Sequence, residues 1–373
     1  MTALAAAALV IWAYLLIGHG RFWSAGPVLV PGRPLQAIPV DIVVPARDEA
    51  ESIEPTLRSL LAQDYAGPVH VFLVDDGSAD GTGDIARRLV PSAARQLTVI
   101  TGTPRPPGWS GKLWAVQQGL ERTTADLVLL TDADIVHDPA HLSTLVRKAE
   151  ADRLDLVSEM VELRATSLAE RALVPAFVFF FQLLYPFARV NDPGSRVAAA
   201  AGGTILLRRA AFERIGGMAS LRGALIDDVT LAARIKDGGP IYLGHSRLAC
   251  SVRPHPEAAD IWRMVARTAY VQLRFSPLLL AGTVAGLAVI WLVPPLATLF
   301  GTGPARLLGA LAWAGSALSY MPTLRRFRQS PLWALGLPGI ATFYLAATVG
   351  SALDHHRGRG VVWKSRAYRD ADA

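Results

Sequence analysis

The sequence is poor in cysteine and in charge. Its 373 residues include one cysteine, Cys250, which excludes an internal disulfide bond and a cysteine-based zinc site. Charged residues make up 18% of the chain and hydrophobic residues 51%. That charge content is low for a soluble enzyme, yet too high for a chain made only of membrane helices. The apolar residues gather at residues 3–18 and beyond Pro277, so we expect a water-soluble domain held between membrane segments.

The chain also lacks a clustered basic helix with interleaved aromatic residues, so its net charge of +6 does not indicate a nucleic-acid partner. The basic residues instead flank apolar segments, as Arg21, Arg325 and Arg357 do. This placement agrees with the positive-inside rule and with binding to anionic lipid headgroups. We expect the membrane as a partner and no nucleic acid.

Apolar segments at both ends of the chain predict membrane helices. Residues 1–20 have no basic amino-terminal region and no following cleavage site, which predicts an uncleaved anchor. The rest of the predicted organisation is a linker at 21–39, a catalytic domain at 40–277, membrane segments within 278–353 (about 278–299, 306–322 and 331–353) and a basic tail at 354–373.

The orientation of these segments follows from the basic residues. The positive-inside rule places the large domain, the loop around Arg326 and the tail in the cytoplasm, and four simple spans cannot satisfy all three. We expect a multi-pass protein of the bacterial inner (cytoplasmic) membrane whose catalytic domain faces the cytoplasm. Apolar residues 171–190 contain two prolines and are short for a span. We expect them to lie at the membrane surface, with a buried core helix as the alternative.

Strand patterns alternate with helix patterns in the first part of the predicted domain. This alternation predicts an α/β fold with a parallel-rich sheet, whose ligand binds beyond the carboxyl ends of the strands. Acidic residues follow three of the expected strands, at Asp48 and Glu49, at Asp75 and Asp76, and at Asp132 and Asp134.

The Asp132–Asp134 pair suggests a divalent cation. Two carboxylates in an i, i+2 relation at a strand end point to the same side and can share one ion. Turns and helix caps are the alternative role for such residues. An EF-hand starting at Asp76 is excluded, because Arg87 stands where the bidentate glutamate is needed. Lys112, at the entry to an expected helix, can contact a phosphate or be an ordinary surface lysine.

The segments "VVPARDEAESI", "VDDGSADGT", "GKLWAVQQGL" and "LTDAD" resemble, in order and spacing, the motifs of family 2 glycosyltransferases with a GT-A fold. The resemblance implies a hexosyltransferase. It also implies a nucleotide-sugar donor, expected to be UDP-linked, whose base and ribose are bound by the first two motifs, at Ala46, Asp48, Glu49, Asp75 and Asp76. Asp132 and Asp134 would then hold Mg²⁺ or Mn²⁺ on the diphosphate.

The resemblance continues in the second half of the domain. "ALIDDVTLAARI" is similar to the family's acidic pair, and places the catalytic base for an inverting transfer at Asp228, where a helix N-cap is the alternative. Gly202 and Gly203 would let the backbone approach the donor sugar. Gln272 and Arg274 loosely resemble a diphosphate-facing motif, with Phe275 in place of its tryptophan, and basic anchoring to the membrane is the alternative there.

The whole pattern looks most like the bacterial hopanoid-associated glycosyltransferases, with ceramide glucosyltransferases as more distant relatives. "GWSGKLWAVQQGL" and "ALIDDVTLAARIKDGG" carry this closer resemblance. It implies a membrane lipid acceptor in the hopanoid pathway. Transfer to a polyprenyl phosphate, a glycerolipid or a ceramide-like lipid stays open, as does a non-catalytic scaffold or transport protein.

Overall fold

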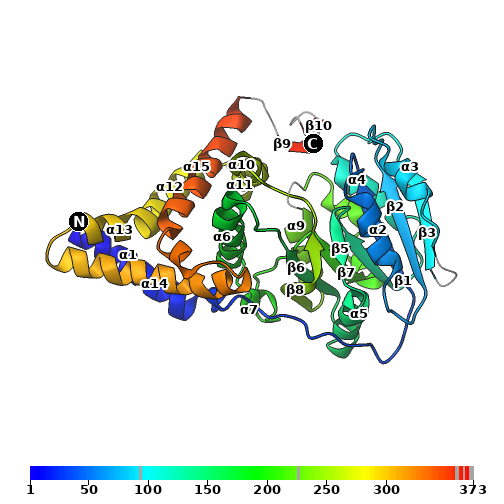
Figure 1. Ribbon diagram of the computed structural model, residues 1–373, viewed down its shortest axis with the longest axis horizontal. Helices are drawn as coiled ribbons and strands as arrows, with labels where there is room; N and C mark the ends of the chain where they lie inside the picture. Colours follow the sequence, from blue (N-terminus) through cyan, green and yellow to red (C-terminus); the bar gives the residue numbers. More distant parts are fainter. Residues whose placement is uncertain (92–94, 225–226, 358–360, 364–365, 369–373) are drawn as a thin grey trace. The chain divides into compact units, whose positions relative to one another are not determined.

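The computed structural model describes residues 1–91, 95–224, 227–357, 361–363 and 366–368, and the chain forms two compact units (Figure 1). The sheet unit consists of 27–164, 189–254 and the last residues from 362; the helical unit consists of 1–26, 165–188 and 255–361. These limits differ from the continuous segment 40–277. Leu225 and Ile226 of the acidic motif, and the tail residues 358–360, 364–365 and 369–373, lie outside the described part.

An eight-stranded sheet in the order β3-β2-β1-β4-β7-β6-β8-β5 forms the sheet unit. Its strands are β1 (Val40–Ala46), β2 (Val69–Asp75), β3 (Arg95–Thr101), β4 (Leu127–Thr131), β5 (Ile135–His137), β6 (Leu156–Glu162), β7 (Thr204–Arg208) and β8 (Ile241–Ser251). The strands β3, β2, β1 and β4 are parallel. Beyond them β7 is antiparallel to both neighbours and β5 is antiparallel to β8. The predicted α/β class is confirmed, but the sheet is mixed: the strands β3, β2, β1 and β4 that the sequence predicted are all parallel, and in the other half only β6 and β8 pair in parallel among the described strands. A short pair, β9 (Val361–Trp363) and β10 (Arg366–Tyr368), stands apart.

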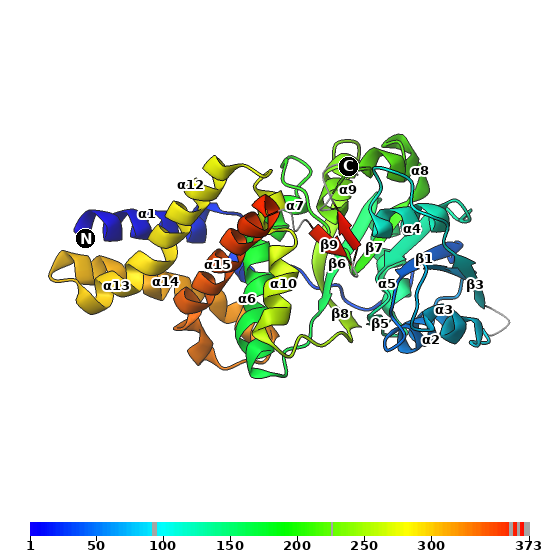
Figure 2. The ribbon, with the colours of Figure 1, turned by 90° about the horizontal axis from the view of Figure 1, so that it is seen from above.

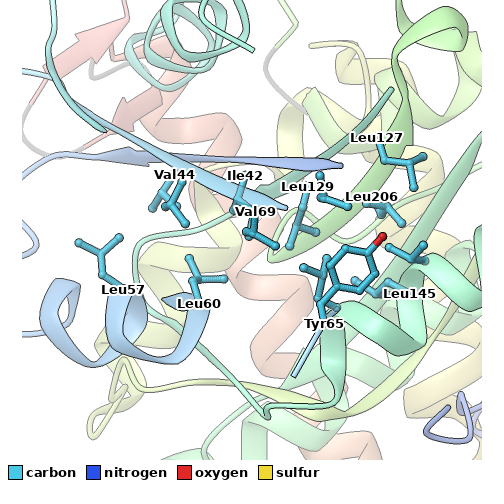
Figure 3. Close-up of a cluster of buried hydrophobic side chains, with 14 of the residues drawn as sticks. Ile42, Val44, Leu57, Leu60, Tyr65, Val69, Leu127, Leu129, Leu145 and Leu206 are labelled. Carbon is cyan, nitrogen blue, oxygen red and sulfur yellow. The ribbon is translucent and has the colours of Figure 1, made fainter. Parts of the chain in front are cut away.

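Helices cover both faces of the sheet. On one face, α2 (Ile53–Leu61), α3 (Thr82–Arg87) and α5 (His141–Ala151) bury apolar residues against alternate positions of the strands (Figure 3). This core includes Ile42 and Val44 of β1 and Leu129 of β4. Every residue of β1 is buried, as is typical of a parallel strand covered on both sides.

On the opposite face, α4 (Gly111–Leu120) packs closely against β1 and β2. A Cβ atom on Gly119 would lie 2.5 Å from Val43 Cγ1, so glycine is needed for this approach. Ser110 caps the helix by accepting a hydrogen bond from the Leu113 N–H group. The amino-terminal end of α4, with Lys112, is thereby fixed at the carboxyl edge of the parallel strands. Two further helices of the sheet unit are α8 (Arg209–Arg214) and α9 (Asp227–Lys236), and the short helix α7 (Phe187–Val190) contains the boundary between the two units.

The helical unit is built from α1 (Thr2–Gly18), α6 (Leu168–Leu184), α10 (Ala258–Ala266), α11 (Ala269–Gln272), α12 (Pro277–Leu287), α13 (Val293–Phe300), α14 (Pro304–Arg326) and α15 (Leu337–His356). A π-helical turn, residues 288–292, joins α12 to α13. Among the described helices, only the continuous stretch Pro277–Phe300 is both long and apolar enough to cross a bilayer, with a mean hydropathy of 2.0. Thr2–Gly18 is apolar but shorter. The other predicted membrane segments form helices, and their insertion stays a prediction.

Helix α6, which contains most of the predicted interfacial segment, lies beside α10 (Figure 2) and also contacts α14 and α15. Its aromatic side chains pack edge-on, with ring centroids 5.0 Å apart between Phe179 and Tyr320 and 4.9 Å apart between Phe180 and Tyr344. Tyr344 also donates a hydrogen bond to the Leu173 carbonyl group. One face of α6 is therefore part of the core of the helical unit.

Candidate active site

The loops after β1 and β2 interlock through short hydrogen bonds. Asp48 has a left-handed backbone conformation with φ +50°, which aspartate tolerates better than most residues. Its carboxylate accepts a hydrogen bond from the Ala79 N–H group, and its own N–H group donates to Ser78 Oγ. The Glu49 N–H group donates to Thr82 Oγ1. The first two predicted motifs are therefore joined into one structure.

Asp75 and Asp76 lie at the centre of this structure and are 8% and 4% exposed. Asp75 accepts a hydrogen bond from the Ser78 N–H group, and the Asp76 N–H group donates to the Ala46 carbonyl group. Arg47 Nη1 lies 3.6 Å from the Asp76 carboxylate. Ala46 is paired in register with Asp75. The five residues predicted for the base and ribose, Ala46, Asp48, Glu49, Asp75 and Asp76, thus belong to one edge of the sheet.

Lys112 and Asp132 form an ion pair, with Nζ 2.7 Å from Oδ1. Burial lowers the pKa of Lys112, but the carboxylates of Asp132, Asp227 and Asp228 outweigh burial and raise this pKa above its usual value. Burial raises the pKa of Asp132, Lys112 opposes this rise, and the charge of Asp134 adds to it. The lysine is therefore a fixed positive charge among acidic groups.

Asp134 is held by a different cation. Arg253, just after β8, places Nε 2.9 Å from Asp134 Oδ2 and Nη2 2.6 Å from Glu49. Ser251 donates a further hydrogen bond to Asp134 Oδ2. The guanidinium group thus bridges the loop after β1 and the loop after β4. The sequence did not indicate Arg253, because a single arginine after a distant strand forms no recognisable pattern.

Asp228 lies in the first turn of α9. Its carboxylate accepts hydrogen bonds from the Gly202 N–H group at 2.9 Å and from the Val229 N–H group at 2.8 Å. Burial raises the pKa of Asp228 to about 6, the charge of Asp227 adds to the rise, and Lys112 and the two N–H groups oppose it. Since α9 begins at Asp227, Asp228 is inside the helix and its contact with Gly202 is not an N-cap interaction.

Lys112, Asp132, Asp227 and Asp228 line one pocket in the sheet unit. Gly202 lies in its wall, where a Cβ atom would be 3.3 Å from Asp228 Oδ2 and 3.6 Å from Lys112 Nζ. Apolar side chains form the rest of the wall; they include Pro45, Leu113, Val116, Leu130, Met218 and Leu231. The pocket therefore combines acidic and basic groups with an apolar surface.

Gly203 has a different position from the one predicted. A Cβ atom on Gly203 would lie 3.1 Å from Val161 Cγ1, so its small size serves packing against β6, and it is Gly202 that lines the pocket. Gln272 and Arg274 belong to the helical unit. There Gln272 donates a hydrogen bond to Tyr185 Oη, and Arg274 has a φ of +51°.

The carboxylates at this edge fit a hard divalent cation. Within the described part of the chain, no group of three or more His, Cys, Asp or Glu side chains forms a complete metal site. Mg²⁺ bound with a nucleotide needs only one or two carboxylates, because phosphate oxygens and water supply the remaining ligands. The charge of Asp134 adds to the raised pKa of Asp132, as is expected of carboxylates two residues apart.

Comparison with known proteins gives a family match within the sheet unit. The model of glycosyl transferase family 2 matches residues 41–216, which contain β1 to β7 and α8. This segment includes both predicted nucleotide motifs and Asp132 and Asp134, and it stops short of Asp228.

Two curated relatives show similarity over shorter stretches. A dodecaprenyl-phosphate galacturonate synthase of Rhizobium johnstonii is 28% identical over 133 residues, which are 35% of this chain and 38% of that protein. An undecaprenyl-phosphate 4-deoxy-4-formamido-L-arabinose transferase of Shewanella sediminis is 33% identical over 113 residues, 30% of this chain and 33% of that protein. The similarity spans a third to two fifths of the length of these relatives.

A solved structure shows similarity over almost the whole chain. The mannosyltransferase of Pyrobaculum calidifontis, in complex with GDP-Man and Mn²⁺, superimposes with a TM-score of 0.56 at 21% identity, and the match covers 94% of this chain and 99% of that one. At this identity the likeness concerns the fold. With the family match, it supports the GT-A-like α/β fold, here with a mixed sheet.

Proposed function

We propose that this protein, whose residues 41–216 match the model of glycosyl transferase family 2, is a membrane-bound inverting glycosyltransferase that moves a sugar from a nucleotide-sugar to a lipid. The observation that carries the proposal is the single pocket lined by Lys112, Asp132 and Asp228. In this pocket the ammonium group of Lys112, which suits a departing diphosphate, lies near the carboxylate of Asp228, which suits acceptance of a proton.

The donor nucleotide lies at the carboxyl ends of β1 and β2 in this proposal. Asp48, Asp75 and Asp76, with Ala46 and Glu49, bind the base and ribose, and a uridine nucleotide is the expected donor. The interlocked hydrogen bonds of these loops support this assignment, because they hold several acceptors in fixed positions. Lys112 contacts the diphosphate from the amino-terminal end of α4, where the helix dipole also favours negative charge.

Asp132 and Asp134 would hold Mg²⁺ or Mn²⁺ beside the diphosphate. When bound, such an ion neutralises charge that develops on the leaving group. Asp134 is oriented by Arg253 and Ser251, and Asp132 by Lys112. Both carboxylates are therefore held in position before an ion binds.

Asp228 removes the proton from the attacking acceptor hydroxyl group. A general base works best with a pKa near the working pH, and the raised pKa of Asp228, about 6, meets this need. The Gly202 N–H group fixes the direction of the carboxylate. A hydroxylated lipid of the hopanoid pathway is the acceptor that the motif resemblance favours.

A second candidate acceptor is a polyprenyl phosphate, which the names of both curated relatives favour. A phosphate oxygen is already anionic at neutral pH and needs no general base. The two acceptors therefore make different demands on Asp228: a hydroxyl acceptor requires it, and a phosphate acceptor does not.

The membrane location rests on the apolar helices of the helical unit. Pro277–Phe300 spans the bilayer in this proposal, and the amino-terminal helix Thr2–Gly18 serves as an anchor. A multi-pass arrangement in the bacterial cytoplasmic membrane, with the sheet unit in the cytoplasm, lets a lipid acceptor react without leaving the bilayer. Residues 171–190 lie at the membrane surface in this proposal.

The test is to incubate membranes that contain the protein with labelled UDP- and GDP-sugars and Mn²⁺, and to identify the labelled lipid by mass spectrometry. We expect Asp134→Asn to abolish metal-dependent nucleotide binding. Asp228→Asn should keep donor binding, lose transfer to a hydroxylated lipid, and spare transfer to a polyprenyl phosphate. A non-catalytic scaffold would show no metal-dependent nucleotide affinity in the wild-type protein, and that result would end the proposal.

A further inference from the structure

A continuous chain of buried polar groups lies beneath the candidate site and has no part in the proposed chemistry. His137 Nε2 lies 3.1 Å from Thr131 Oγ1, the Nδ1 atoms of His137 and His141 are 2.8 Å apart, and His141 Nε2 lies 3.1 Å from Glu159. All four side chains are at most 3% exposed. Buried groups of this kind are costly unless each is satisfied, so the chain constrains the elements that carry them.

The hydrogen-bond inventory assigns the direction of this chain. Thr131 donates its single proton to the Gly203 carbonyl group at 2.8 Å, so Oγ1 must accept from His137 Nε2–H. His137 Nδ1 is then the acceptor for His141 Nδ1–H. One proton remains between His141 Nε2 and Glu159. Burial, and then the nearby His141, lower the pKa of His137 well below its usual value, which agrees with a neutral His137.

The chain ends at the turn that faces the candidate base. Gly203 accepts from Thr131, while the neighbouring Gly202 donates its N–H group to Asp228. Ser158 holds the flanks of the same turn through the Ala201 N–H group and the Thr204 carbonyl group. The turn that contacts Asp228 is thus held from β4 by Thr131 at the Gly203 carbonyl group, and from β6 by Ser158, which also donates to the Ala201 carbonyl group.

Thr131 also immediately precedes Asp132 in the chain. The same residue therefore belongs to the strand that presents the donor-side carboxylate and holds the turn that orients the acceptor-side carboxylate. From this geometry we propose that Glu159, His141 and His137 form a positioning relay, which acts through Thr131 and the Gly202–Gly203 turn to set the place of Asp228 relative to Asp132. The catalytic consequence rests on the proposed function; the hold on the turn does not.

The matched variants are Thr131→Val and Thr131→Ser. Valine keeps the shape of threonine but removes the hydroxyl group, and serine keeps the hydroxyl group. Glu159→Gln perturbs the far end of the relay. Ser143→Ala is the control, since Ser143 is a buried residue of α5 whose hydrogen bond goes to Asp64 and not to the relay.

The first readout is hydrogen exchange of the peptide around residues 198–206, measured by mass spectrometry on the full-length protein without substrate. We expect Thr131→Val and Glu159→Gln to speed exchange at this turn by about tenfold, because the turn that holds the Gly202 N–H group against Asp228 loses its contact with Thr131 or has that contact weakened. Thr131→Ser and Ser143→Ala should exchange as the wild type does. Unchanged exchange in both Thr131→Val and Glu159→Gln overturns the relay.

The second readout is turnover per folded molecule. Loss of the relay should lower kcat by about 10- to 100-fold and leave the Kd of the donor nucleotide within about twofold, because Lys112 still holds Asp132. The double variant that combines Thr131→Val with Glu159→Gln should turn over no more slowly than Thr131→Val alone, because both changes act through the same contact. Altered exchange with unaltered kcat overturns the link to Asp228. If the variants alter exchange but the wild-type protein transfers no sugar, the hold on the turn is supported and the proposed function is rejected.

Discussion

Lys112 contacts Asp132 across the carboxyl edge of the sheet, with 2.7 Å between Nζ and Oδ1, and it is the cation that opposes the raised pKa of Asp228. A residue from α4 therefore affects both a donor-side carboxylate and the candidate base. Its removal should be visible in the pH dependence of the reaction as well as in donor binding.

The wild-type enzyme should lose transfer to a hydroxyl acceptor as the pH falls through about 6. The active form of a general base is the deprotonated one, and the Asp228 carboxyl group binds a proton below its pKa of about 6. The measurement is kcat/KM against pH at saturating metal. A profile that is flat between pH 5 and pH 8 would argue against Asp228 as the base.

Replacing Lys112 with methionine should move the acidic limb of that profile to higher pH. Lys112 lowers the pKa of Asp228, so its loss lets burial and Asp227 raise this pKa further. Donor affinity should fall as well, by about tenfold, because a charge-assisted contact to phosphate is lost. Lys112→Arg, which keeps the charge, should leave the acidic limb in place. An equal shift in both variants would mean that the shape of the Lys112 side chain, and not its charge, causes the shift.

Arg253→Gln should destabilise the sheet unit and increase its response to metal. Without the guanidinium group, Glu49 and Asp134 lose their arginine partner at 10% and 12% side-chain exposure. Since Arg253 itself is 37% exposed, we expect a modest loss of about 1–2 kcal/mol. Mn²⁺ should raise the Tm of this variant more than that of the wild type or of Arg253→Lys. Equal metal-induced shifts in all three proteins would contradict the prediction.

Glu170→Gln should destabilise the helical unit only at pH values at which the Glu170 carboxylate is charged in the wild type. Glu170 accepts hydrogen bonds from the Thr166 and Ser167 N–H groups, the Thr166 hydroxyl group and the His255 N–H group. Burial raises its pKa, but these bonds outweigh burial and lower the pKa from 4.5 to about 2. The stabilisation is therefore present above pH 4.5 and is lost as the pH falls towards 2.

At pH 7 this variant should cost roughly 2–3 kcal/mol of unfolding free energy. Urea unfolding at pH 7 and pH 3 measures the difference, which should shrink at the lower pH. A difference that does not depend on pH would mean that the carboxylate charge has no part in holding the start of α6.

Sequence patterns predicted the parallel half of the fold well, because there local pattern and position coincide. The buried strand Val40–Ala46 is found as expected, and acidic residues follow β1, β2 and β4 at one edge. The other half depends on pairings between distant segments. Thus β5 pairs with β8, more than a hundred residues later, and only this pairing brings Arg253 near Asp134.

The same reason explains what the sequence missed within the site. His137 ends β5 and His141 begins α5, and two histidines four residues apart form no recognisable pattern in the sequence. Their connection to Glu159 arises only because β6 lies beside α5. Gly202 and Gly203 were predicted as a pair with one role, but neighbouring peptides present their missing side chains to different surroundings, the pocket in one case and Val161 in the other.

The chain enters the helical unit three times, at its beginning, at residues 165–188 and after residue 254. No single cut can therefore separate a water-soluble catalytic fragment. Deleting everything after residue 254 would strip α14 and α15 from α6 and leave Phe179 and Phe180 without their aromatic partners in the middle of the remaining polypeptide. Preparations for biochemistry consequently need the intact chain, and a shortened version is expected to aggregate.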